Sequence, residues 1–240
     1  MLRWSIKLGT TYSNWNRPVT NTLHITTREF ASASASRKST ASAFKSKATE
    51  TSQHTDLASF LAYAKRVGLD EKSNTFIGTQ YEYLVAERLA RYGFSLKRVG
   101  GASDFGIDLL GEWTIPSTSK TLKVLVQCKA GSKVGPHFIR ELEGSFVGAP
   151  PGWRGSGVLG VLVTGKQTTK GMRDALARSR SPMAYFCCTL DGVMKQMQWN
   201  QRAEEEGLEG IDVALKRGAG EEEEDEIVLM KDGLPLPIIE

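Results

Sequence analysis

Two polar side chains follow an apolar run in the segment VLVQCKAG, residues 124–131. Val124 to Val126 suit the middle of a buried strand, whereas Gln127 and Lys129 bring an amide and an ammonium group to its end. Side chains of a strand alternate between its two faces, so Gln127 and Lys129 point the same way. An amide and a lysine held together at the end of a core strand indicate a polar site.

A carboxylate is expected beside this pair. Asp108 interrupts the segment GIDLLG, residues 106–111, and its neighbours Ile107 and Leu109 are predicted to point to the opposite face. A hairpin between this strand and the next one brings Asp108 close to Gln127 and Lys129.

Glu82 supplies a second carboxylate from a predicted helix. It shares a helical face with Val85, Ala86 and Leu89, which lie three, four and seven residues further on. A carboxylate on such an apolar, inward stripe must be neutral, paired or bound to a metal. The alternative to a metal site at Glu82 is therefore a salt bridge to a buried basic residue.

These side chains form a donor set for a hard divalent cation. Mg²⁺ or Mn²⁺ takes carboxylate and amide oxygens, and Mg²⁺ binds one or two carboxylates while keeping several waters. The ammonium group of Lys129 can orient a metal-activated water or neutralise charge on a phosphate. The alternative for Lys129 is a strand-end lysine whose ammonium group simply reaches solvent.

The elements that must position these residues are helices and strands in alternation. The hydrophobic periodicity and the glycine stops predict a mixed sheet with helices on both faces, an α/β fold. The predicted helices are 57–68, 73–94, 135–148 and 168–179, the predicted strands are 95–99, 107–113, 121–130, 157–165 and 183–190, and a late strand with a turn at residues 232–233 is expected near the C-terminus.

The order Glu82, Asp108, Gln127-Cys128-Lys129 resembles the PD-(D/E)XK nuclease superfamily, and more closely its Mrr-type restriction endonuclease domain. The similarity runs from about residue 78 to 185. It includes YEYLVAERLARYGF, VGGASDFGIDLLG, VLVQCKA, IRELEG and GVLVT. Together with the N-terminal composition described below, the chain resembles the fungal mitochondrial "required for respiratory growth" family, which carries this nuclease-like domain.

The resemblance implies a restriction-endonuclease-like mixed sheet and a role for each matching residue. Asp108 is implied to be the principal metal ligand, Gln127 the second ligand, Lys129 the catalytic lysine and Glu82 an auxiliary acid that also contacts the metal. Asp104 is a further ligand candidate, and the alternative for it is a turn residue that bonds its own backbone. Gln127 departs from the acid found in most of the superfamily, and an amide contributes no negative charge to a metal site.

Four cations in the second half of the predicted domain are candidates for contact with a nucleic-acid backbone. Such contacts are independent of base sequence and sensitive to salt. The four residues are Arg140, Lys166, Lys170 and Arg173.

Charge is distributed unevenly along the 240 residues. Residues 1–50 hold 8 Lys/Arg against 2 Asp/Glu, and residues 201–240 hold 4 against 13. The N-terminal segment is rich in Ser and Thr, and Glu29 is the only acid before residue 50, which is typical of a mitochondrial transit peptide ending after Phe30. The alternative is a basic arm that binds nucleic acid.

We therefore expect four parts: a transit peptide over 1–30, a disordered linker over 31–54, a restriction-endonuclease-like domain over 55–200, and an acidic extension over 201–240. The predicted protein is a Mg²⁺- or Mn²⁺-dependent DNA nuclease of the mitochondrial matrix, supporting genome maintenance and respiratory growth. The alternative is a weakly active or inactive nucleic-acid-binding or assembly factor with the same fold. No apolar run approaches the roughly 20 residues of a membrane span, and the oligomeric state is left open.

Overall fold

The computed structural model describes residues 54–99, 106–218 and 225–239. Its helices are α1 (Leu57–Val67), α2 (Asn74–Ala90), α3 (Pro136–Gly148), α4 (Lys170–Arg178), α5 (Gln201–Ala203) and the π-helical turn η2 (Glu204–Leu208). Its strands are β1 (Phe94–Arg98), β2 (Leu109–Thr114), β3 (Thr121–Lys129), β4 (Val158–Thr164), β5 (Met183–Cys188), β6 (Met194–Trp199), β7 (Ile211–Lys216), β8 (Glu226–Lys231) and β9 (Leu234–Pro235). The predicted transit peptide, nearly all of the predicted linker, Asp104 and the four consecutive glutamates 221–224 lie outside the described residues.

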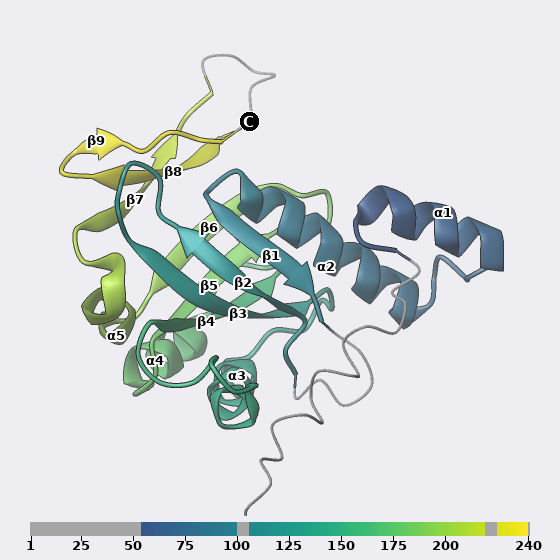
Figure 1. Ribbon diagram of the computed structural model, residues 1–240, viewed down its shortest axis with the longest axis horizontal. Helices are drawn as coiled ribbons and strands as arrows, with labels where there is room; N and C mark the ends of the chain where they lie inside the picture. Colours follow the sequence, from purple (N-terminus) through teal and green to yellow (C-terminus); the bar gives the residue numbers. More distant parts are fainter. Residues whose placement is uncertain (1–53, 100–105, 219–224, 240) are drawn as a thin grey trace, which may run out of the picture. The chain divides into compact units, whose positions relative to one another are not determined.

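Six strands form one sheet in the order β1-β2-β3-β4-β5-β6, which is also their order along the chain (Figure 1). The strands β1, β2 and β3 are antiparallel, β4 and β5 continue parallel to β3, and β6 is antiparallel to β5. The parallel pairs are joined through α3 and through α4, as crossover connections require. The prediction of a mixed α/β fold is thus confirmed.

The helix α2 packs on one face of this sheet because one of its stripes is apolar. Ser73 caps its N-terminus by accepting a hydrogen bond from the backbone N–H of Phe76 at 3.2 Å. The side chains of Tyr81, Val85 and Leu89 recur every four residues and are buried against the sheet.

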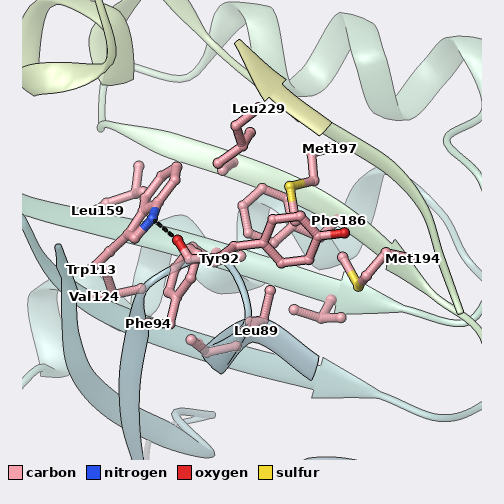
Figure 2. Packing of buried hydrophobic residues seen from close by; sticks show 14 of the residues in the cluster. Leu89, Tyr92, Phe94, Trp113, Val124, Leu159, Phe186, Met194, Met197 and Leu229 are labelled. Carbon is pink, nitrogen blue, oxygen red and sulfur yellow. Dashed lines mark hydrogen bonds between the residues drawn. The ribbon is translucent and has the colours of Figure 1, made fainter. Parts of the chain in front are cut away.

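Trp113 is the largest side chain buried in this core. It stacks on Phe94 with ring centroids 4.4 Å apart and donates a hydrogen bond from Nε1 to the carbonyl oxygen of Tyr92 at 2.9 Å (Figure 2). A buried indole N–H needs such an acceptor. The bond ties β2 to the turn that follows α2, and so it fixes where the helix ends relative to the sheet.

The helices α3 and α4 cover the opposite face (Figure 1). Leu142 of α3 and Met172 of α4 pack there against Leu125, Leu162 and Tyr185 of the central strands. Every residue of β4 is buried, because helices or strands cover it on both faces. The continuous apolar run of residues 157–165 therefore predicted this strand correctly.

A second sheet, β7-β8-β9, packs on the same side as α2. Its apolar residues, together with Leu208 before it, join the core around Trp113. The predicted late strand is β8, and the turn at Asp232 and Gly233 follows it, with both residues at positive φ. The sequence reading did not anticipate β6, β7, β9 or α5. In the part of the chain that the structure describes, we find no helix with the length and apolar character to span a membrane.

Candidate functional site

The β2–β3 hairpin places Asp108 against the end of β3. The backbone N–H of Asp108 donates to the carbonyl oxygen of Val126 at 2.9 Å, and its carboxylate atom Oδ2 accepts from the backbone N–H of Cys128 at 2.7 Å. Cys128 lies between Gln127 and Lys129, so the predicted approach of Asp108 to this pair is confirmed. Asp108 reaches the pair through the backbone of β3.

The neighbours of Asp108 do not share a face, contrary to the prediction. Ile107 packs in the core under α3 and α4, whereas Leu109 packs in the core under α2. The reason is that β2 begins only at Leu109, so the chain at Ile107 and Asp108 does not follow the alternation of an extended strand.

Gln127 and Lys129 share one face of β3, as their spacing predicted. That face is covered by α3, and both side chains contact Glu141 of this helix. The Oε1 atom of Glu141 accepts a hydrogen bond from Nε2 of Gln127 at 2.8 Å and another from Nζ of Lys129 at 2.8 Å. One carboxylate oxygen therefore orients both the amide and the ammonium group. On this face of β3, the side chain of Gln127 is fully buried, whereas that of Lys129 is partly exposed to solvent.

Glu141 is the site residue that the sequence reading missed. The signal in the sequence was its position three residues after Phe138 and four before Ser145, on the flank of the apolar stripe of α3. Residues four apart share a helical face, so Glu141 had to lie on the flank of α3 that faces β3. The acid in IRELEG looks like an ordinary surface charge unless the helical periodicity of this segment is taken into account.

The amide of Gln127 is held from two sides. Nε2 donates to Glu141, and Gly106 lies so close that a Cβ added there would come within 2.8 Å of Nε2. Gly106 also has φ +76°, which favours glycine. The other amide atom, Oε1, is buried and has no hydrogen-bond partner among the described residues. A buried, unpartnered oxygen is costly in a folded protein, and it suits a bound cation.

Glu82 lies on the inward side of α2, as predicted, and it is paired. Its carboxylate accepts from Nε of Arg98 in β1, and the two side chains are only 13% and 21% exposed. Arg98 also lies over the ring of Tyr83, 5.9 Å from its centroid. An inward carboxylate must be neutral, paired or bound to a metal, and in the structure Glu82 is paired in a salt bridge.

Burial and the negative charges of Asp108 and Glu82 all affect the pKa of the Cys128 thiol. Desolvation raises the pKa of the Cys128 thiol well above its ordinary value, and the negative charges of Asp108 and then Glu82 raise it further. Lys129 opposes this effect only weakly. Both carboxylates therefore lie close enough to Cys128 to disfavour its thiolate form.

Two donors at the end of β3 have the chemistry that a divalent ion takes. Within residues 54–99, 106–218 and 225–239, no three His, Cys, Asp or Glu side chains are grouped as a metal site. Mg²⁺ does not require such a group, because it binds through one or two carboxylates and keeps its waters. Asp108 and the unpartnered Oε1 of Gln127 are the donors that match this chemistry.

The four predicted nucleic-acid contacts are all exposed. Arg140 lies on α3, Lys170 and Arg173 lie on α4, and Lys166 lies in the loop that leads to α4. They belong to the same side of the sheet as Gln127 and Lys129. Arg173 is partly engaged, because its Nη1 donates to the carbonyl oxygen of Thr168 at 3.0 Å.

The fold and this cluster together define a mixed α/β protein with a polar site at the carboxyl end of a central strand. A family model described as "Required for respiratory growth protein 7" matches residues 73–122 and 114–214, which is more than half of the chain. The chain belongs to this family. The match includes Glu82, Asp108, Gln127, Lys129 and Glu141.

Curated relatives come from yeasts. A Schizosaccharomyces pombe protein, named as uncharacterized and mitochondrial, is 36% identical over 156 residues, which cover 62% of this chain and 61% of the relative. The mitochondrial Required for respiratory growth protein 7 of Vanderwaltozyma polyspora is 33% identical over 32% of this chain and 48% of its own length. That of Saccharomyces cerevisiae is 30% identical over 35% and 53%, respectively. The chain thus spans between about half and 61% of the length of these relatives.

Proposed function

We propose that this protein is a mitochondrial, metal-dependent nuclease that hydrolyses phosphodiester bonds in DNA. The observation that carries the proposal is the meeting of Asp108 with the backbone of Cys128, between an oriented amide and an oriented lysine. The antiparallel β2–β3 hairpin, the parallel β3–β4 pair and the helix α2 with Glu82 support a restriction-endonuclease-like, PD-(D/E)XK-type arrangement.

Each residue has a distinct role in this proposal. Asp108 and Oε1 of Gln127 would hold Mg²⁺ or Mn²⁺, and Glu82, which pairs with Arg98 on the α2 side of β3, would be an auxiliary acid. The metal would act as a Lewis acid on the phosphate and lower the pKa of a bound water. Lys129 would hold the attacking water in line or neutralise charge that develops on the phosphate.

Glu141 compensates for the glutamine in this scheme. Because a carboxylate accepts and does not donate hydrogen bonds, Glu141 fixes Nε2 of Gln127 toward itself. The amide oxygen is then turned away and available to a cation. Glu141 also keeps the ammonium group of Lys129 at the end of the strand.

The names of the relatives and the N-terminal composition support the proposed location. Curated relatives are named as mitochondrial, and several are named for respiratory growth. The basic, Ser- and Thr-rich residues 1–30 agree with import into the matrix. We place the protein there, with maintenance of the mitochondrial genome as its contribution to respiratory growth.

A cleavage assay tests the proposal. The full chain is incubated with supercoiled plasmid and with RNA, in Mg²⁺, in Mn²⁺ and in chelator, beside Asp108→Ala and Lys129→Ala. We expect nicking of DNA that requires the metal and disappears in both variants. Asp212→Ala and Lys97→Ala, which remove the same groups from exposed positions, are the matched controls. Cleavage that survives both Asp108→Ala and Lys129→Ala would show that the site is wrongly placed.

A nucleic-acid-binding module without cleavage is the second candidate. It is favoured by the neutral amide at position 127 and by the four exposed cations on the α3/α4 side. This function predicts binding that weakens steeply with salt and that weakens further when Arg140, Lys166, Lys170 and Arg173 are changed together to Gln. Such binding, with no cleavage in any metal, would select this candidate over the nuclease.

A further inference from the structure

A cavity of about 450 Å³ lies apart from the site at Asp108, between the C-terminal end of α2, the β5–β6 turn and the facing ends of β7 and β8. Four cations line it, Arg88 and Arg91 from α2 and Lys216 and Arg217 from the end of β7. Asp191, Asp225 and Glu226 supply three carboxylates. The volume falls in the range of small-molecule pockets.

Among the described residues, the cations are only partly neutralised within the cavity. Arg91 pairs with Glu226, with Nη2 and Oε1 3.1 Å apart. Asp191 is committed to its own turn, since hydrogen bonds from Thr189 and from its own backbone lower its pKa. Arg88, Lys216 and Arg217 have no ion pair among the described residues.

Arg88 is the cation that the fold positions most closely. Its Nε is buried and has no hydrogen-bond acceptor among the described residues. Gly192 of the β5–β6 turn, at φ +89°, makes room for it, because an added Cβ would lie 2.7 Å from Nε and 3.3 Å from Nη2. The turn itself is closed by a hydrogen bond from the Gly192 N–H to the carbonyl oxygen of Thr189 at 2.9 Å.

A buried guanidinium N–H without an acceptor, such as Nε of Arg88, is an unfavourable arrangement unless an anion completes it. Desolvation of an unpaired N–H costs free energy, and a phosphate repays it because its oxygens match the planar fork of arginine. The residues Lys216 and Arg217 are exposed, so they can contact the same anion from the solvent side.

We propose that this cavity binds the phosphate group of a small hydroxyl-bearing phosphate ester. Arg88 takes the phosphate with Lys216 and Arg217, and Asp225 accepts hydrogen bonds from the hydroxyl groups. A nucleic-acid strand is the less suitable ligand, because its successive phosphates would meet three carboxylates in the same cavity. The proposal does not depend on nuclease activity, since none of these residues contacts the site at Asp108.

Calorimetric titration of the full chain tests this site. The probes are inorganic phosphate and ribose 5-phosphate in a low-salt buffer without other phosphates, and the variants are Arg88→Gln, Arg88→Lys and the double variant Lys216→Gln/Arg217→Gln. Ribose 5-phosphate should bind saturably and more tightly than inorganic phosphate. Arg88→Gln should weaken binding about tenfold, which corresponds to one charge-assisted contact, and Arg88→Lys should restore only part of it because the fork is lost.

Controls separate this site from general electrostatics and from misfolding. Arg178→Gln removes one positive charge from an exposed position of α4 and should leave the affinity unchanged. The double variant alters only exposed side chains, so it should fold normally and lower the affinity severalfold even if Arg88→Gln is unstable.

Two results would overturn the proposal. One is the absence of saturable ribose 5-phosphate binding up to about 10 mM, the weak limit of specific recognition. The other is the finding that these variants weaken binding of a DNA oligonucleotide while the sugar phosphate is unaffected. The second result would assign the cavity to a nucleic-acid surface instead.

Discussion

Removal of the Glu141 carboxylate is a direct test of how the polar end of β3 is built. In Glu141→Ala, the buried amide of Gln127 loses the acceptor of its Nε2, and Lys129 loses its ion-pair partner. The two losses differ in size, because Gln127 is fully buried whereas the side chains of Lys129 and Glu141 are 29% and 43% exposed.

The magnitude follows from this difference. Leaving a buried amide unsatisfied costs about 1–3 kcal/mol. The partly exposed ion pair is screened by solvent and contributes about 0.5 kcal/mol. We therefore expect Glu141→Ala to lower the free energy of unfolding by about 2 kcal/mol. In a Gln127→Leu background no amide remains to be satisfied, so the same change should cost only about 0.5 kcal/mol.

Equilibrium unfolding in urea, followed by tryptophan fluorescence, measures these four proteins. Trp113 is buried in the core and reports its loss. Glu87→Ala, at an exposed position of α2, is the control and should stay within about 0.5 kcal/mol of the parent protein. An equal cost of Glu141→Ala in both backgrounds would refute the reasoning, since Glu141 would then act through Lys129 or through α3 alone.

Three further predictions concern the fold and its dependence on pH. Gly111→Ala should prevent stable folding, because its Cβ would lie 1.9 Å from a carbonyl oxygen of β1, whereas Gly131→Ala meets nothing within 4 Å and should leave the thermal midpoint within a few degrees. Arg98→Ala should destabilise by about 2–3 kcal/mol in urea, because the largely buried carboxylate of Glu82 loses its partner, and a cost below about 0.5 kcal/mol would contradict the importance of this pair. Burial raises the pKa of Cys188 from 9.0 to about 12, so the unfolded chain releases this proton first, and stability that is complete below pH 9 should decline as the pH rises toward 12. The decline should be shallower in Cys188→Ala, by about 1.4 kcal/mol per pH unit, and equal slopes would be inconsistent with a protonated thiol in the folded state.

The features that the sequence predicted are those governed by local periodicity. The alternation in β3 assigned Gln127 and Lys129 to one face and Val126 and Cys128 to the other, and the structure agrees. The continuous apolar run of β4 and the apolar stripe of α2 were equally clear. The approach of Asp108 followed from one further assumption, a hairpin between adjacent strands.

The features that were missed depend on contacts between distant segments. Glu141 is a site residue only because the crossover through α3 returns it over β3. Arg98 sits in a short strand, and nothing in its own neighbourhood indicates that it reaches Glu82. The strands β6 and β7 carry polar residues on one side, since both lie at sheet edges, so neither has the apolar run that marks a buried strand.

The agreement between strand order and chain order has a consequence for how this domain is assembled. A chain that emerges N-terminus first, from a ribosome or an import pore, can add each strand from β1 to β6 to the edge of the strand before it. Each strand from β2 to β6 can pair with a strand that precedes it in the chain and is already present. The apolar face under α2 is completed only when β7, β8 and β9 arrive, so until then it remains partly uncovered and prone to aggregation. The strands β7, β8 and β9 therefore determine when the partly folded chain stops exposing this apolar face to other protein molecules.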